Sequence, residues 1–285
     1  MSSAIDAVAN KPNQSSLPWA LWLRQMGAIL RFDLQKNFLG RRAILIYLLA
    51  LLPLFPLLVF ALVPADRKDF SSYSLIYSLL YNGLILRTVV FFGCAWIFMN
   101  LFRGEIVDRS LHYYFLSAVR REVLVVGKYI SGLVTSIVLF TFTTVVAMLL
   151  LYLPNFYSQS MRYFTEGSGL TQLLTYAGVT ILACIGYGAF FVVVGLFVRN
   201  PIIPAVLLYG WEWLNFLLPP LLKKISVIHY LNSLTPVPVA EGPFAVVAEP
   251  TPVWIAVPSM LVVTLLVLIL AAYRIRHMEI RYGSD

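Results

Sequence analysis

Long apolar runs, each closed by charged residues, constrain this chain more than any other feature of its sequence. A helix needs about 20 apolar residues to cross the hydrocarbon core of a bilayer. Six runs meet this need, at Ala43–Val63, Tyr73–Phe102, Val123–Leu153, Leu170–Val198, Pro201–Leu222 and Val253–Tyr273. Because a helix satisfies its own backbone hydrogen bonds in lipid, the sequence predicts an all-α membrane protein with six transmembrane helices.

Composition supports a membrane protein and argues against a nucleic-acid partner. Of 285 residues, 60% are hydrophobic and 12% are charged, whereas soluble domains carry about 25% charge. The net charge of +8 comes from residues at the ends of the apolar runs, not from one solvated patch. Cys94 and Cys184 lie inside apolar runs and match no disulfide or metal-binding spacing. We therefore expect no metal and no bound cofactor.

The distribution of basic residues predicts the orientation. With both termini inside, 15 of the 21 Lys and Arg residues lie on the cytoplasmic side and five on the outside, while Arg87 lies within a run. Cytoplasmic loops carry the excess of Lys and Arg in membrane proteins. We therefore expect a multi-pass protein of the cytoplasmic (inner) membrane with both termini in the cytoplasm.

The chain divides into three parts. Residues 1–17 lack a signal-peptide pattern and read as a disordered cytoplasmic tail. Residues 18–40 predict an amphipathic helix in the membrane interface, the alternative being a soluble helix. Its apolar face is predicted to carry Trp19, Trp22, Leu23, Met26, Leu30 and Leu34, with Arg24, Arg31 and Gln35 on another face. Residues 41–285 form the six-helix domain, with an external loop at about 223–252 that is a candidate re-entrant or interfacial cap.

The charged segment RGEIVDRSLHYYFLSAVRREVLVVGK, residues 103–128, separates the second and third runs. Its Gly127-Lys128 pair invites comparison with a phosphate-binding loop, which requires G-x-x-x-x-G-K-[ST]. Glu122 stands where the first glycine is needed, and Tyr129 follows the lysine. We therefore expect no ATP hydrolysis by this chain, and expect Lys128 to extend toward the lipid headgroups.

The same segment predicts a short amphipathic helix. Val107, Leu111, Tyr114, Phe115 and Ala118 share one face, and Asp108, Arg109 and His112 lie on the other. The polar face is available to a partner. The alternative is a solvated connector with no special role.

The segment resembles a pattern of ABC-2 type transporter permeases. The matching residues are Glu105, Ser110-Leu111, the run 114–116, Arg121 and Gly127-Lys128; Ala118 replaces the usual proline. The resemblance extends over nearly the whole chain, from the interfacial helix to the long last external loop. It implies a type V exporter-like fold, with a coupling helix at about 104–120 that seats in a separate ATPase subunit.

The resemblance also implies partners. Two permeases, as a homodimer or a homologous heterodimer in the lipid bilayer, would work with two ATPase subunits that use ATP and Mg²⁺. The expected ATPase contacts are Glu105, Asp108, Arg109, His112, Arg120 and Arg121. The apolar, aromatic bundle favours export of an amphipathic or lipid-like substrate.

Two ionisable residues lie within predicted spans, where charge is costly and suggests function. These are Arg87 in the second span and Glu212 in the fifth, at depths that differ by roughly 6 Å. By resemblance both spans line the translocation path, so we expect Arg87, Glu212, Trp211 and Trp213 to face it. The difference in depth is small enough for an arginine to bridge, so Arg87 and Glu212 are candidates for an ion pair. The alternative is that Arg87 extends outward, Glu212 is hydrogen-bonded locally and the tryptophans pack within the bundle.

Other function classes remain open at this point. An ion-gradient-driven secondary transporter could carry a proton on Glu212, although no internal repeat is visible. A non-transporting membrane assembly subunit is a further alternative. No nucleophile motif or paired carboxylates indicate a membrane enzyme.

Overall fold

The computed structural model describes residues 19–41, 43–62, 72–107, 120–153, 160–198, 200–239 and 249–277. Every regular element in these ranges is a helix, which confirms the all-α prediction. The predicted tail, residues 1–17, lies outside the described residues. Most of the predicted coupling helix and part of the predicted external loop also lie outside them.

Five helical segments are long and apolar enough to cross a membrane, as a multi-pass membrane protein requires. They cover Ala43–Leu62, Tyr73–Ile106, Arg121–Tyr152, Gly169–Phe197 and Val253–Arg276. These segments match the first, second, third, fourth and sixth predicted spans.

The first two spans are not uniform helices. The first consists of α2 (Ala43–Leu51) and α3 (Leu54–Leu62), which separate at Pro53. Proline lacks the N–H that a continuous helix needs, so it breaks the ladder there. The second consists of α4 (Tyr73–Leu80), the π-helix η4 (Tyr81–Val90) and α5 (Phe91–Val107). The remaining long spans are α7 (Arg121–Tyr152), α9 (Gly169–Phe197) and α13 (Val253–Arg276).

The fifth predicted span differs from the expectation of one continuous helix. It is α10 (Ile202–Trp213) followed by the 3₁₀-helix η7 (Leu214–Leu217), and this apolar stretch is too short to count with the five. The chain breaks at the Pro219-Pro220 pair and continues as α11 (Pro220–Lys223) and α12 (Val227–Leu234). Proline ends the helix because it cannot donate to the preceding turn. The structure thus corrects the continuous span to a broken one.

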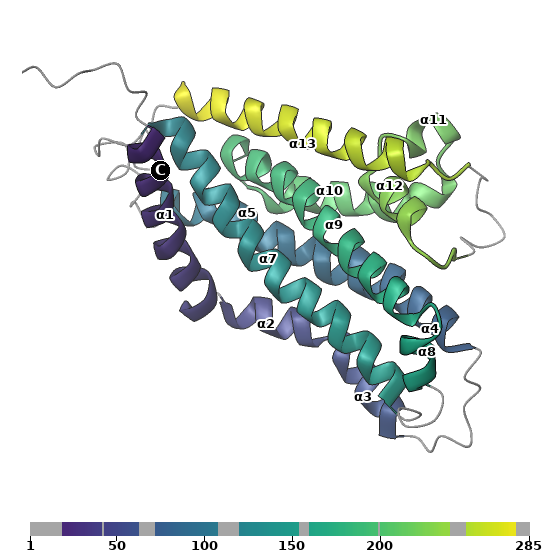
Figure 1. The fold of residues 1–285 in the computed structure, drawn as a ribbon. Coiled ribbons are helices and arrows are strands. Elements are labelled where there is room, and N and C mark those ends of the chain that lie inside the picture. Colours follow the sequence, from purple (N-terminus) through teal and green to yellow (C-terminus); the bar gives the residue numbers. More distant parts are fainter. Residues whose placement is uncertain are drawn as a thin grey trace, which may run out of the picture.

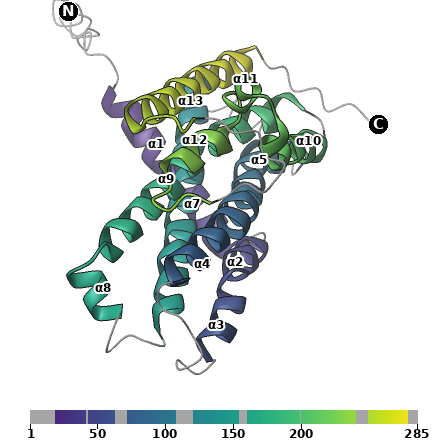
Figure 2. The same ribbon diagram turned by 90° about the vertical axis from the view of Figure 1, so that its right-hand side faces the viewer.

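The long spans run side by side, with α9 packed against α5, α7 and α13, and with α1 (Trp19–Leu39) packed along α7 (Figure 1). Arg121 near the start of α7 donates from Nη1 to the carbonyls of Ile275, at 3.4 Å, and Arg276, at 3.0 Å. The starts of α1 and α7 and the end of α13 therefore share one end of the bundle, which we call the basal end. Figure 2 shows α3 and α8 (Met161–Thr165) at the opposite end.

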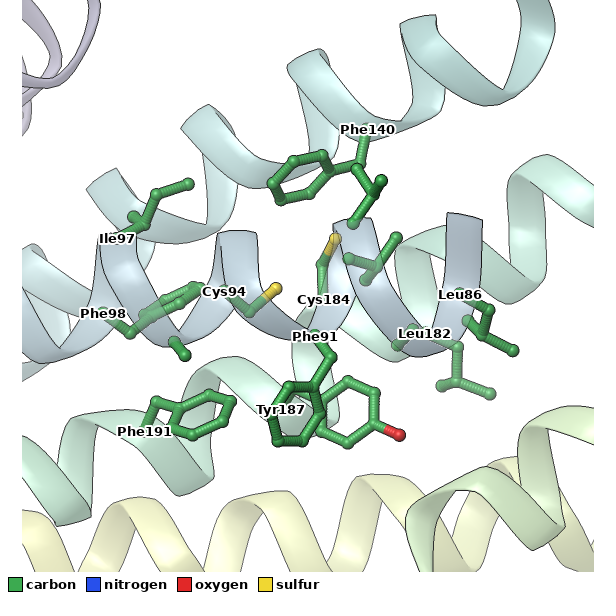
Figure 3. Close-up of a cluster of buried hydrophobic side chains, with 14 of the residues drawn as sticks. Leu86, Phe91, Cys94, Ile97, Phe98, Phe140, Leu182, Cys184, Tyr187 and Phe191 are labelled. Atoms are coloured by element: carbon green, nitrogen blue, oxygen red, sulfur yellow. The ribbon is translucent and has the colours of Figure 1, made fainter. Parts of the chain in front are cut away.

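Aromatic side chains fill the core between α5, α7 and α9. Phe91, Phe98, Phe140, Tyr187 and Phe191 are all at most 1% exposed and surround Cys94 and Cys184, which are free thiols (Figure 3). Glycines on α9 allow close approach: a methyl group added at Gly188 would lie 2.5 Å from Cζ of Phe98. Close packing of this kind without a cavity is typical of helix contacts in membranes.

Candidate functional site

The structure places the two ends of the predicted coupling segment. Asp108, Arg109 and His112 lie outside the described residues, so their expected contacts stay predictions. Glu105, Arg120 and Arg121 are described, and all three lie at the basal end of the bundle.

Glu105 ends the second span inside the protein, where it joins a buried ion cluster. Nζ of Lys128 lies 2.6 Å from Oε1 of Glu105 and 3.3 Å from Oδ2 of Asp33. The lysine side chain is 0% exposed and each carboxylate side chain is 3% exposed. Ser131 also donates to Oδ2 of Asp33, at 3.4 Å. The cluster therefore connects α1, α5 and α7, three elements that are distant in sequence.

This cluster corrects the expectation for Lys128 and shows the surroundings of Glu105. Lys128 does not extend to the headgroups, because two carboxylates next to it supply the charge and hydrogen bonds that a buried ammonium needs. Glu105 was expected at an ATPase surface, but its side chain is buried and faces Lys128. Its expected contact with an ATPase subunit stays a prediction. A small cavity beside it is lined by Asp33, Asn37, Asn100 and other residues of α1, α2 and α5.

Arg120 and Arg121 fix the other end of the segment. The Arg120 guanidinium lies 4.9 Å from the centre of the Trp22 ring on α1, a distance typical of a cation–π contact. Arg121 donates to the last carbonyls of α13, which have no partner within the helix and favour a cation. Residues 108–119 are therefore bracketed by contacts to α1, α7 and α13.

Helix α1 covers almost the same residues as the predicted interfacial helix, and the structure shows which of its side chains are buried. Ile29 and Asp33 are buried, and Ile29 is within contact distance of the position a side chain would take at Gly127 on α7. Arg24 and Arg31 are exposed, as are Trp19, Leu23, Phe32 and Leu39. The buried face thus includes Asp33, a charged residue that the hydrophobic pattern did not mark as buried.

Glu212 has four hydrogen-bond donors around its carboxylate. Ser226 Oγ lies at 2.8 Å, the backbone N–H groups of Val227 and Ile228 at 3.1 and 2.9 Å, and the Tyr187 hydroxyl at 3.4 Å. The two N–H groups belong to the first turn of α12, where the unpaired donors and the helix dipole favour a negative charge. Glu212, which is 4% exposed, therefore ties α10 to α9 and α12.

Arg87 and Glu212 are not brought together as an ion pair in the described part of the chain. Arg87 lies in η4, and its Nε atom is buried without a hydrogen-bond partner in the structure. The local hydrogen bonding of Glu212 agrees with the alternative interpretation of its role.

The two tryptophans of α10 differ in exposure. Trp213 is 52% exposed and packs edge-on against Phe216, with ring centres 6.4 Å apart. Trp211 is half-buried. Whether either ring contacts a substrate stays a prediction.

The described residues contain no group of three or more His, Cys, Asp or Glu side chains able to hold a metal ion. His229 has Thr251 Oγ1 at 3.2 Å from its Nε2.

Comparison of the chain with protein-family models, with curated proteins and with solved structures finds no match.

Proposed function

We propose that this chain is the transmembrane permease subunit of an ATP-binding cassette transporter of the ABC-2 type. Two copies would associate with two separate ATPase subunits to export an amphipathic or lipid-like substrate. The chain would carry no catalytic residue for ATP hydrolysis, and ATP and Mg²⁺ would bind to the partner. The basal end, which holds Arg120, Arg121, Arg274 and Arg276, would face the cytoplasm of the inner membrane.

One observation carries this proposal: the charged segment 108–119 begins and ends at fixed points on the bundle. Glu105 precedes it and is held by Lys128, while Arg121 follows it and is held by α13. A partner that pushes on this segment would therefore move α1, α5, α7 and α13 together. A flexible connector would need no such anchors at both ends.

The hydrogen bonding of Glu212 argues against the proton-driven alternative. A proton carrier must release and accept its proton during each cycle, whereas the four donors around the Glu212 carboxylate give it a structural role at the junction of α9, α10 and α12. Protonation would leave at least one backbone N–H of α12 with a weakened acceptor. The assembly-subunit alternative makes no use of the anchored segment.

Co-expression with an ABC ATPase encoded beside this gene tests the proposal. The triple change Asp108→Ala, Arg109→Ala and His112→Ala should abolish co-purification of the ATPase and its stimulated ATP hydrolysis. The matched control is Arg162→Ala, because Arg162 is exposed at the opposite end of the bundle and should leave both unchanged. Full ATPase binding by the triple variant would refute the assignment of this segment.

A further inference from the structure

Arg87 is a charge within the second span that no carboxylate of the described membrane helices neutralises. Those helices contain three carboxylates, Glu105, Glu122 and Glu212. Glu105 is paired with Lys128, and Glu122 lies in the first turn of α7 at the basal end. Glu212 is occupied by its own four donors.

The depth of Arg87 makes escape to water costly. The span Tyr73–Ile106 has its midpoint between residues 89 and 90, so Arg87 lies roughly 4 Å from the middle of the helix. With the span centred on a core about 30 Å thick, the nearer boundary is about 11 Å away. The Arg87 side chain is half-buried, and its Nε atom is buried without a hydrogen-bond partner in the structure. Charges held at such depth face a partner or a functional path.

The surface next to Arg87 is open. Gly83 lies one turn away along η4, and a methyl group added there would meet no atom within 4 Å. Leu75 and Leu79, which continue this side of the span, are 48% and 51% exposed. The η4 segment is a π-helix, and π-bulges within α-helices are frequent at functional sites. The arginine thus stands at the edge of an apolar face long enough to hold an acyl chain.

We propose that Arg87 is an intramembrane anion-binding site that takes the carboxylate or phosphate of an amphiphile, whose acyl chain lies along Leu75 and Leu79. An identical second copy would not neutralise Arg87 from its described membrane helices, because their carboxylates are the same three: Glu105 and Glu212 have partners, and Glu122 lies at the basal end. Binding of such an amphiphile at Arg87 does not depend on transport. That the bound amphiphile is also the exported substrate rests on the proposed exporter function, and it narrows the substrate class to anionic amphiphiles.

Electron paramagnetic resonance on the purified chain in phosphatidylcholine vesicles, without an ATPase, tests the site. The probes are spin-labelled stearate in its ionised form and its methyl ester, which differ in charge and share the acyl chain. Stearate should show a saturable, motionally restricted component with about tenfold higher association than the ester, as expected for a hydrogen bond to a charged group. Spin-labelled phosphatidylglycerol, compared with phosphatidylcholine, distinguishes a phospholipid phosphate from a free carboxylate as the preferred anion.

Variants assign the preference to the residue. Arg87→Gln should remove the tenfold difference, Arg87→Lys should keep most of it, and Arg24→Gln on the exposed face of α1 should leave it unchanged. Equal association of the charged and neutral members of both probe pairs with the wild-type chain would overturn the proposal without any variant being needed. Survival of the preference in folded Arg87→Gln would also overturn it. Neither result depends on ATPase binding, so failure here and failure of the exporter proposal are distinguishable.

Discussion

The Lys128 ammonium lies 2.6 Å from the Glu105 carboxylate, and neither side chain is more than 3% exposed. Together with Asp33, this pair joins the N-terminal helix to two membrane spans. Desolvation makes such a pair costly to form, and removal of one member leaves the other charge uncompensated. The pair therefore sets the position of the basal end more strictly than apolar contacts would.

Glu105→Gln and Lys128→Met should each destabilise the protein by about 3–5 kcal/mol, because each leaves a buried charge without its closest partner. Thermal unfolding of the purified protein in detergent measures the effect. The double variant should lose less stability than the sum of the two single losses, since both members of the pair are gone and Asp33 is the one charge of the cluster that remains. Additive losses in the double variant would show that the two side chains act independently.

Glu212→Ala should loosen the junction between α10 and α12, because the N–H groups of Val227 and Ile228 lose their acceptor. Hydrogen exchange at these two amides should accelerate by about tenfold or more, in line with about 1–3 kcal/mol for an unsatisfied buried group. Glu166→Ala serves as the control, since Glu166 forms an exposed pair with Arg162 that contributes little. Unchanged exchange at both amides would contradict the role assigned to Glu212.

Gly188→Ala should cost about 1–3 kcal/mol, because the new methyl group would lie 2.5 Å from the buried Phe98 ring. Gly178→Ala on the same helix is the matched control: it meets no atom within 4 Å and should be neutral or stabilising through helix propensity. The difference in unfolding temperature between the two variants is the measurement. Phe98→Leu, which removes the ring, should rescue Gly188→Ala.

Cysteine labelling tests the orientation. Arg120→Cys should react with an impermeant maleimide only after the cytoplasmic side is opened, whereas Glu166→Cys should react from outside in intact cells, because the two positions lie at opposite ends of the bundle. The native Cys94 and Cys184 are 0% exposed and should stay unlabelled. Labelling of both introduced cysteines from the same side would be incompatible with this arrangement.

The long spans could be predicted because about 20 consecutive apolar residues leave a helix few alternatives in lipid. The fifth span could not, since its composition remains apolar through Leu222 and only the proline pair at 219–220 signals a break. A proline pair is equally typical of the end of a complete crossing. In place of the second half of the crossing, the chain forms the short helix α12, whose first N–H groups donate to Glu212. This arrangement depends on contacts between Glu212 and residues 14 to 16 positions further along the chain.

The ion cluster was hidden for a different reason. Asp33 and Lys128 are 95 positions apart, and their pairing arises only when α1 packs on α7. Hydrophobic periodicity predicts that Lys128 lies near the start of a helix, and it gives no sign that Asp33 is buried. The reason is that neither residue has its partner nearby in the sequence. The apolar sequence around Arg87 and Glu212 marks both as candidate functional residues. Only the structure shows that Glu212 accepts four hydrogen bonds and that Arg87 forms no ion pair within the described helices.

The separation of Asp33 from Lys128 has a consequence for synthesis of the chain. At about 5–20 residues per second, the 95 positions between them correspond to roughly 5–20 s of elongation. During that interval Asp33 on α1, and later Glu105 on α5, are synthesised before the lysine that neutralises them, which follows on α7. Docking of the N-terminal helix is therefore a late event of biogenesis, completed only after the insertion machinery has delivered α7.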